Sequence, residues 1–188
     1  MKKEKCWWCL GKEVYEKYHD EEWGVPKSDD TRIFEALTLE SFQSGLSWWT
    51  ILQKRENFRE AFDYFNVKKV ANYNSVKVEE LLQNKGIIRH RGKIEACINN
   101  AKKIVEIQQS GNSFSDFLWK YVKHKPLQPN FTTQEEVPSQ TELSQRIAKD
   151  LKKKGLKFIG ATGVYSLMQA IGMTNDHLVG CFRHQQLL

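Results

Sequence analysis

No stretch of this 188-residue chain approaches the roughly 20 apolar residues that a membrane-spanning helix needs. The first five residues, MKKEK, lead into CWWC and not into the apolar segment of a signal peptide. Only 4 prolines and 11 glycines occur, which excludes a collagen-like repeat and makes long linkers implausible. With 40% hydrophobic and 28% charged residues the chain is also not a disordered tail. We therefore expect a cytoplasmic, single-domain protein over residues 1–188, with no membrane partner.

Acidic residues are outnumbered, with 23 Asp and Glu against 29 Lys and Arg and a net charge of +6. This balance favours a polyanionic partner such as nucleic acid. A plain solvated basic surface explains the same number, because net charge carries information about partners and not about the fold.

Cysteines are few, at positions 6, 9, 97 and 181, and a disulfide framework is not expected inside a cell. Cys97 lies on an apolar helical face and suits simple burial. The residues that could ligate a metal are Cys6, Cys9, His19, His177, Cys181 and His184. His177 and Cys181 are four residues apart, so a helix would place them on one face.

With Cys6 and His19, this pair would complete the Cys2His2 set of a closed structural zinc site. Such a site would tie together two chain ends, residues 1–24 and 173–188, that otherwise fray. The residues alone leave the ligand set open. Cys9 competes with Cys6 or His19, His184 competes with Cys181, and four ligands from opposite ends follow no recognised short spacing.

The apolar residues follow helical spacing nearly throughout, and no convincing alternating strand is present. The predicted fold class is all-α, with roughly eight helices and a helical core over about residues 28–172. Prolines 126, 129 and 138 mark one irregular stretch, residues 124–138. Capping residues and glycine stops predict helices from Ser28–Thr31 to Gly45, from Ser47 or Thr50 to Phe62, from Ser75 to Gly86, over 94–107, over 114–122 after Ser113, from a capping box at Ser139–Glu142 to Lys154, and from Ala161 to Gly172.

A hairpin of two helices is predicted over residues 151–171, joined by the glycine-containing segment 152–163 (KKKGLKFIGATG). Such a turn can present backbone N–H groups to a phosphate oxygen at a helix N-terminus, and the lysines add charge. Its candidate DNA contacts are Lys157, Gly160 and Thr162. An ordinary helix–turn–helix corner with a solvated lysine-rich end explains the pattern equally well.

A second basic segment covers residues 85–93 (KGIIRHRGK). Arg89, Arg91 and Lys93 could contact phosphate, which gives salt-dependent affinity and little sequence information. They could equally form a plain solvated helix start.

Aromatic residues concentrate near the amino terminus, where five of the six tryptophans fall within the first 49 residues. They surround, in the sequence, a single carboxylate, Glu40, on a predicted helix with Leu37, Leu39 and Phe42. This acid either lies on the solvent-facing stripe or is buried. Buried among aromatic rings it would need a specific partner, and an everted base stacked on those rings would be one.

Several separated segments resemble the DNA-3-methyladenine glycosylase I family, and the resemblance runs from Cys6 to about Cys181. The segments are 18–26 (YHDEEWGVP), 39–48 (LESFQSGLSW), 54–57 (KREN), 86–94 (GIIRHRGKI) and 175–177 (NDH). The resemblance implies a helix–hairpin–helix DNA glycosylase fold and hydrolytic release of 3-methyladenine from alkylated double-stranded DNA. A monomer would suit an enzyme that must scan duplex DNA.

The resemblance also implies roles for individual residues. It places structural Zn2+, one per chain, on Cys6, His19, His177 and Cys181, and so favours Cys6 over Cys9. It makes Glu40 the acid that contacts the base, with Tyr18 and Trp48 lining the pocket and acting in catalysis, and Trp8 and Tyr15 close by. Gly45 and Leu46 match the segment that fills the gap left in the duplex.

Three positions depart from the family or superfamily pattern. Cys9 creates an additional Cys-x-x-Cys, and Phe158 stands in the hairpin where relatives often have glycine. Asn175 occupies the place of the superfamily's usual aspartate, and Asp176 is displaced by one residue. Thr162 lies at the place of the lysine of lyase-type relatives, so we expect no strand-nicking step.

Three other functions are compatible with parts of the pattern. A zinc-containing DNA-binding module would bind DNA and release no base. A glycosylase with a broader range would also excise 7-methylguanine or hypoxanthine. A zinc hydrolase would need an open coordination position, which a four-ligand site does not leave.

Overall fold

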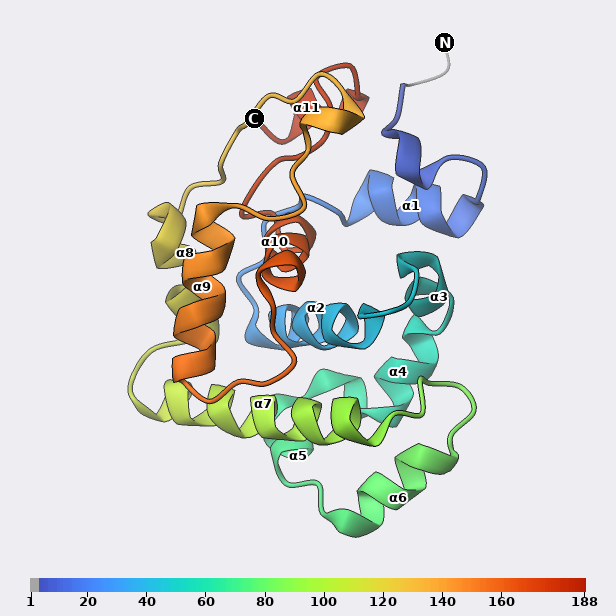
Figure 1. The fold of residues 1–188 in the computed structure, drawn as a ribbon, viewed down its shortest axis with the longest axis vertical. Coiled ribbons are helices and arrows are strands. Elements are labelled where there is room, and N and C mark those ends of the chain that lie inside the picture. The colour runs from blue at the N-terminus through green and yellow to red at the C-terminus, as the bar shows by residue number, and fades with distance from the viewer. Residues whose placement is uncertain (1–3) are drawn as a thin grey trace.

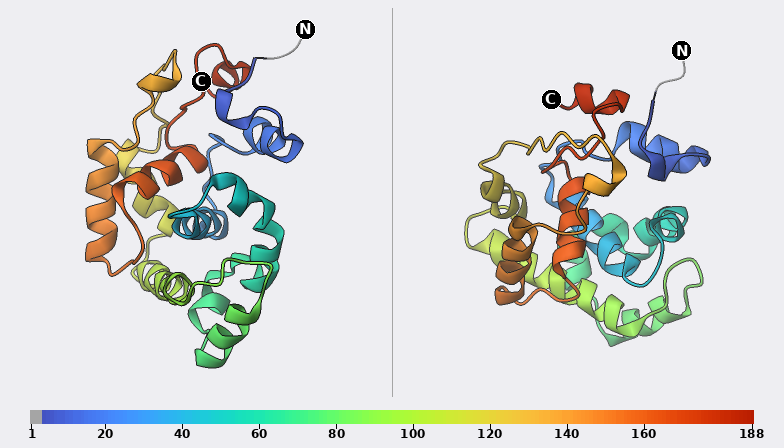
Figure 2. Two further views of the ribbon diagram at one scale, coloured as in Figure 1. Left: turned by 45° about the vertical axis from the view of Figure 1, so that its right-hand side comes forward. Right: turned by 45° about the horizontal axis from the view of Figure 1, so that its top comes forward.

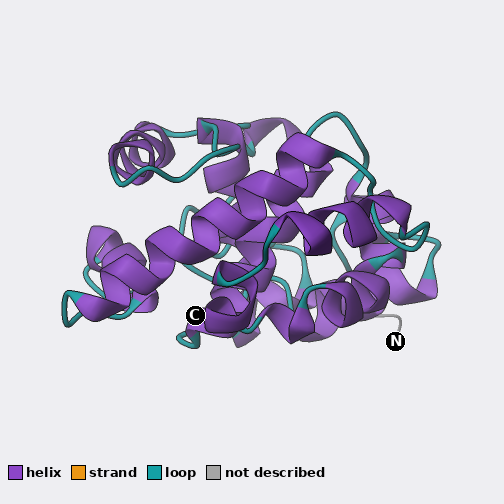
Figure 3. Ribbon diagram, turned by 90° about the horizontal axis from the view of Figure 1, so that it is seen from below, coloured by secondary structure: helices purple, strands orange, loops and turns teal. Residues whose placement is uncertain are grey.

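The computed structural model describes residues 4–188, and these residues fold into helices joined by loops (Figure 3). The only β pairing in this range is one isolated bridge between Leu127 and Thr174. No helix among the described residues is long and apolar enough to cross a membrane. The α-helices are α1 (Glu13–Glu21), α2 (Asp30–Gln43), α3 (Trp48–Gln53), α4 (Arg55–Ala61), α5 (Val67–Ala71), α6 (Ser75–Gln83), α7 (Arg91–Gln109), α8 (Phe114–Trp119), α9 (Glu142–Lys153), α10 (Ala161–Ala170) and α11 (Phe182–Gln186), with 3-10 turns at Trp7–Cys9, Asp63–Phe65, Lys120–Val122 and Gln134–Glu136.

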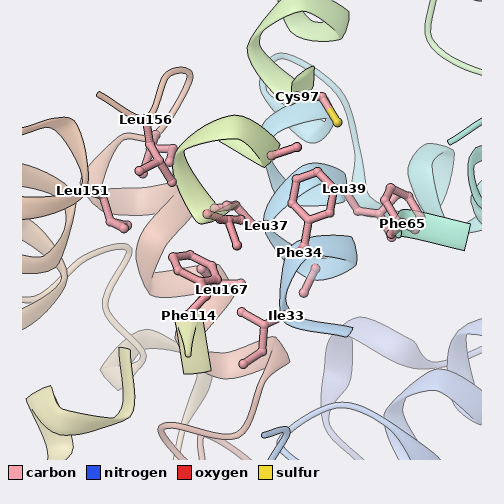
Figure 4. Close-up of a cluster of buried hydrophobic side chains, with 14 of the residues drawn as sticks. Ile33, Phe34, Leu37, Leu39, Phe65, Cys97, Phe114, Leu151, Leu156 and Leu167 are labelled. Atoms are coloured by element: carbon pink, nitrogen blue, oxygen red, sulfur yellow. The ribbon is translucent and has the colours of Figure 1, made fainter. Parts of the chain in front are cut away.

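Helix α2 is the central element, with α9 and α10 on one side and α3 and α4 on the other (Figures 1 and 2). It begins where the Asp29 side chain accepts a hydrogen bond from the backbone N–H of Arg32. Its apolar side chains Ile33, Phe34 and Leu37 are almost completely buried, and Figure 4 shows them among side chains from α7, α8, α9 and α10. Eight of the 14 residues of α2 are buried, so packing fixes the direction in which its remaining side chains point.

The all-helical prediction is confirmed, but several helix boundaries differ from those expected. The helix expected to run to Phe62 is interrupted at Lys54, so α3 and α4 are separate, and α5 was not expected. Asn74 caps α6 in place of Ser75. Helix α9 is capped by Thr141, which exchanges hydrogen bonds with Ser144, and not by the box expected at Ser139. At the start of α6 and of α9, the side chain of a polar residue next to the expected one accepts the hydrogen bond from the free backbone N–H.

The turn between α9 and α10 is held in place by α7. The buried Asn100 side chain accepts a hydrogen bond from the Lys157 N–H (2.7 Å) and donates one to the Lys157 carbonyl (3.0 Å). Asn99 donates to the Gly155 carbonyl at 2.8 Å. The turn is therefore a fixed surface element.

Both ends of the chain meet at one end of the molecule, where α1 and α11 lie near each other (Figures 1 and 2). The Phe182 N–H donates to the Glu4 carbonyl at 3.0 Å, and the Gly24 N–H donates to the Gln169 carbonyl at 3.1 Å. Gly172, with φ +76°, passes so close to the first segment that a Cβ would lie 2.5 Å from the Pro26 nitrogen. Only glycine fits at this crossing.

Candidate base pocket and metal-ligand cluster

A Cys2His2 cluster lies where the two chain ends meet. Its donor atoms come from Cys6, His19, His177 and Cys181, all lie within 4.8 Å of one another, and all four residues are buried. Neighbouring donors are 3.2 Å apart from His177 Nδ1 to His19 Nε2 and 3.4 Å apart from Cys181 Sγ to His19 Nε2. A tetrahedron with bonds of about 2.0–2.3 Å has edges of roughly 3.3–3.8 Å, so the donors suit one metal ion.

Hydrogen bonds outside the cluster orient its two imidazoles. His19 Nδ1 lies 2.8 Å from an Asp20 carboxylate oxygen, and His177 Nε2 lies 3.1 Å from the Trp23 carbonyl. Each ring therefore turns its other nitrogen toward the cluster, as second partners do in metal sites. Hydrogen bonds from Cys6 and then from His177 and His19 lower the pKa of the Cys181 thiol below its ordinary value.

The two other candidate metal ligands near the cluster, Cys9 and His184, are not part of it. Cys9 is buried, but its thiol donates to the Cys6 carbonyl (3.2 Å), and burial raises its pKa to about 11. His184 is buried outside the cluster, and its backbone carbonyl accepts a hydrogen bond from the Asn175 side chain. Cys97, as expected, is buried in the core.

An aromatic cavity of about 240 Å3 adjoins the cluster. It is smaller than the ~300–1,000 Å3 typical of sites for drug-sized ligands, a size that suits a single base. The five residues predicted for the base pocket all line it, together with side chains from the other end of the chain. Its walls are Trp7, Trp8, Tyr15, Tyr18, Trp23, Glu40, Gln43, Trp48, Val137, Ser166, Gln169 and Asp176.

The rings form a continuous tilted array. Trp8 lies 5.1 Å from Tyr15 and 6.4 Å from Tyr18 between ring centroids, and Tyr18 lies 5.4 Å from Trp48. Trp8 and Trp23 also pack edge-on against each other at 4.9 Å. The indole N–H of Trp48 is buried and has no hydrogen-bond partner among the described residues.

Glu40 is the acidic group in this array that no protein donor contacts. Its carboxylate forms no hydrogen bond or ion pair with any described residue, and burial raises its pKa to about 8. Of the two placements that the sequence left open, the structure therefore favours the one away from open solvent, because Glu40 is half-buried and lines the cavity. A ligand that donates hydrogen bonds to this group would replace the solvation that burial removed.

A network of ion pairs centred on Arg55 lies next to the Tyr18 ring. The Arg55 guanidinium donates two hydrogen bonds to Glu22 (2.8 and 2.7 Å) and one to Glu35 (2.6 Å), and it lies 5.9 Å from the Tyr18 ring centroid. These groups line a second cavity of about 360 Å3, on which Tyr18 and Trp48 also border. Arg55 thus connects α1, α2 and α4 next to the aromatic array.

Asp176 lines the aromatic cavity and was not among the predicted site residues. Its carboxylate is buried and already accepts hydrogen bonds from Tyr165, Gln169 and Thr174 (2.5, 2.7 and 2.6 Å). The neighbouring Asn175 side chain donates to the His184 carbonyl and not toward the cavity. The sequence placed Asp176 beside a metal-ligand candidate but carried no sign of these three donors.

The predicted DNA-contact residues lie around a wider hollow of about 670 Å3 beside the cavity. Gly45 and Leu46 line it from the turn after α2, and Gly160 and Thr162 line it from the start of α10. Lys157 is exposed on the adjoining turn. Glu40 and Ser166 line both spaces, so the hollow leads into the aromatic cavity.

Two of the three expected phosphate contacts in residues 85–93 are engaged elsewhere. Lys93 is buried, and its ammonium group donates to the carbonyls of Phe42 (2.9 Å) and Ser44 (2.6 Å) at the end of α2. Arg91 forms an ion pair with Glu79 (2.7 Å). Lys93 therefore fits neither of the alternatives left open, a phosphate contact or a solvated helix start, because the partial negative charge at the C-terminus of α2 is a closer partner.

Solved structures of similar chains share this fold. A crystal structure of 3-methyladenine DNA glycosylase I matches with a TM-score of 0.93 at 47% identity, covering 95% of this chain and 98% of that one. A structure that addresses 3-methyladenine recognition by the Staphylococcus aureus enzyme matches with a TM-score of 0.92 at 38% identity, covering 95% of both chains. Fold and pocket together define an enzyme that acts on N-glycosyl bonds.

The chain belongs to the methyladenine glycosylase family, whose family model matches residues 8–184. It is 49% identical over 178 residues to DNA-3-methyladenine glycosylase 1 of Escherichia coli strain K12, covering 95% of each chain. It is 44% identical to DNA-3-methyladenine glycosylase of Haemophilus influenzae, over 94% of this chain and 96% of that one.

Proposed function

We propose that this chain excises 3-methyladenine from alkylated double-stranded DNA by hydrolysing the N-glycosidic bond. The unpartnered Glu40 carboxylate in an aromatic cavity is the observation that carries this proposal. Relatives that share up to 49% of the sequence bear the name of this activity. One relative has been solved in complex with 3-methyladenine, and it matches with a TM-score of 0.92 at 37% identity.

Recognition would rest on Glu40 and the surrounding rings. An everted 3-methyladenine would stack on Trp48, with Tyr18 orienting it and Trp8 and Tyr15 closing the aromatic wall. Glu40 would accept hydrogen bonds from the purine edge that carries the exocyclic amine. Ordinary adenine has a stronger glycosidic bond and a different hydrogen-bond pattern, so it would be rejected.

The reaction needs little acid–base catalysis from the protein, because methylation at N3 leaves the base cationic. When the bond from the sugar to the base breaks, its electron pair neutralises that charge, and water adds to the sugar carbon and releases a proton to the solvent. Stabilising the departing base and the sugar cation can then replace a strong general base. Thr162 carries no amine, so no Schiff base forms and the enzyme would be monofunctional.

The DNA would lie over the hollow next to the cavity. Residues 151–171 would act as a helix–hairpin–helix element, in which Gly160, Thr162 and Lys157 contact phosphates. Gly45 and Leu46, both exposed, would fill the gap left by the everted nucleotide. We further propose one domain over residues 1–188, acting as a cytoplasmic monomer on bacterial DNA.

The Cys2His2 cluster would hold one structural Zn2+ through Cys6, His19, His177 and Cys181. Two thiolates and two imidazoles are its preferred closed donor set, and the measured separations fit it. The bound ion would join the two chain ends and supply no step of the reaction, because four protein ligands leave no open position.

The deciding experiment incubates the protein with methylated duplex DNA and measures release of free bases by chromatography. Release of 3-methyladenine, with 7-methylguanine and hypoxanthine retained in the DNA, supports the proposal. DNA binding without base release would indicate a binding module. Release of all three bases would indicate a broader glycosylase.

A further inference from the structure

Two exposed apolar side chains line the hollow that leads to Glu40. Leu46 lies in the turn after α2 and is 42% exposed. Phe158 lies in the turn before α10 and is 49% exposed. Exposure of a large ring costs free energy that burial would recover, so its position needs a reason.

The backbone at Phe158 makes this position more unusual. Its φ is +54°, in the left-handed region that bulky side chains rarely adopt and glycine adopts readily. The ring is nevertheless held in a defined place, because His90 packs edge-on against it with centroids 6.1 Å apart. A Cβ on Gly92 would lie 3.5 Å from the Phe158 Cζ. The start of α7 thus supports the ring at the edge of the hollow.

The charge around the hollow indicates which partner covers it. Lys152 lines the hollow, and Lys149, Lys152 and Lys153 line a shallow depression next to it. Lysines around an apolar pair match a polyanion with apolar sugar and base surfaces. The hollow is also continuous with the aromatic cavity through Glu40 and Ser166, so its occupant must be the molecule that delivers the base.

We propose that Phe158 is a second apolar DNA contact, in addition to Leu46, whose ring packs against the deoxyribose of the lesion-bearing strand beside the everted nucleotide. This inference rests on the proposed function. The turn that carries Phe158 also carries Lys157, three residues before Gly160, so phosphate and sugar of one backbone segment would be contacted together. Phe158 would raise affinity for DNA without touching the excised base.

The test compares Phe158→Gly and Phe158→Asn with the wild-type protein, because both replacements tolerate a left-handed backbone. Tyr64 offers a matched control: it has φ +52°, is 66% exposed and lines none of the cavities described above. Three quantities are measured: affinity for a duplex with a tetrahydrofuran abasic-site analogue, affinity for free 3-methyladenine, and the melting temperature.

We expect both Phe158 variants to bind the duplex about tenfold more weakly, the loss typical of one ring contact. Free-base affinity and melting temperature should be retained, and Tyr64→Gly should bind the duplex as the wild type does. Unchanged duplex affinity in the Phe158 variants would overturn the proposal, even if excision by the wild type is normal. A lower melting temperature or weaker free-base binding would also overturn it, since the ring would then support the fold or the base pocket.

Discussion

The imidazole of His177 packs edge-on against the indole of Trp23, with ring centroids 4.6 Å apart and planes at 79°. Trp23 also lines the aromatic cavity, so the metal-ligand cluster and the cavity share a wall. Trp8, which also lines the cavity, packs edge-on against the imidazole of His19, with ring centroids 5.3 Å apart. A change in the cluster should therefore reach the base pocket through these two indoles.

Cys6→Ala tests the structural role of the cluster, with Cys9→Ala as its matched control. Cys6→Ala should abolish retention of zinc and lower the melting temperature by roughly 10 °C, which corresponds to about 3–5 kcal/mol for a chain of this size. Cys9→Ala removes a buried thiol outside the cluster and should keep the metal. Elemental analysis and calorimetry measure both effects. A metal-free wild type of unchanged stability would remove the zinc proposal.

Glu40→Gln separates recognition from stability. The folded-state pKa of Glu40, near 8, exceeds the ordinary value of 4.5 because burial disfavours the charge. The wild type therefore loses stability as pH rises from about 4.5 through 8, and the glutamine variant does not. Above pH 8 the variant should melt at a higher temperature while excising 3-methyladenine at least ~100-fold more slowly.

Thermal melts across pH 4–9 and single-turnover excision measure these two effects. Parallel pH profiles for the two proteins would contradict the buried position of the carboxylate. Full excision by Glu40→Gln would contradict its role in recognition.

Lys93→Met tests whether a buried ammonium group holds the turn that carries Leu46. The variant removes the hydrogen bonds to the Phe42 and Ser44 carbonyls, so excision from DNA should fall about tenfold. Free-base affinity should stay near the wild-type value. The slope of log affinity for DNA against log salt should not change, whereas Lys157→Ala should reduce it by about 1. A reduced slope in Lys93→Met would mean that Lys93 contacts phosphate after all.

Arg55→Gln probes the network behind Tyr18. The variant leaves the Glu22 carboxylate without its cation, while Glu35 keeps Arg59 at 2.9 Å, so we expect a stability loss of about 1–3 kcal/mol. Because Arg55 also lies over the Tyr18 ring, base affinity should fall several-fold. Urea unfolding and fluorescence titration with 3-methyladenine measure the two losses. Lost stability with full base affinity would restrict Arg55 to a structural role.

Local patterns predicted the helices because N-cap side chains and apolar spacing are properties of neighbouring residues. Asp29 before α2 and Ser113 before α8 are examples that the structure confirms. The break at Lys54 was missed because both halves of that segment continue an apolar face and only packing divides them. Lys93 was assigned to the surface because its partners, at the end of α2, lie about fifty residues away in the sequence.

In the candidate site, too, local sequence patterns predicted some features, and others depend on contacts between distant parts of the chain. The four cluster residues lie at opposite chain ends, so spacing left competitors, and the family resemblance favoured the set that the fold brings together. Glu40 could be chosen as an acid amid apolar residues, but its orientation depends on helices that cover α2 from several sides. Asp176, Gln169 and Ser166 reach the cavity from the carboxyl-terminal part of the chain, and no local pattern marks them.

The most direct test of the account is to diffuse free 3-methyladenine into crystals of this protein and measure its distance from Glu40. The account predicts a base stacked in the aromatic cavity, with its exocyclic amine within about 3.2 Å of a Glu40 carboxylate oxygen. A base bound in the charged cavity beside Arg55, or one whose amine contacts another residue, would contradict it.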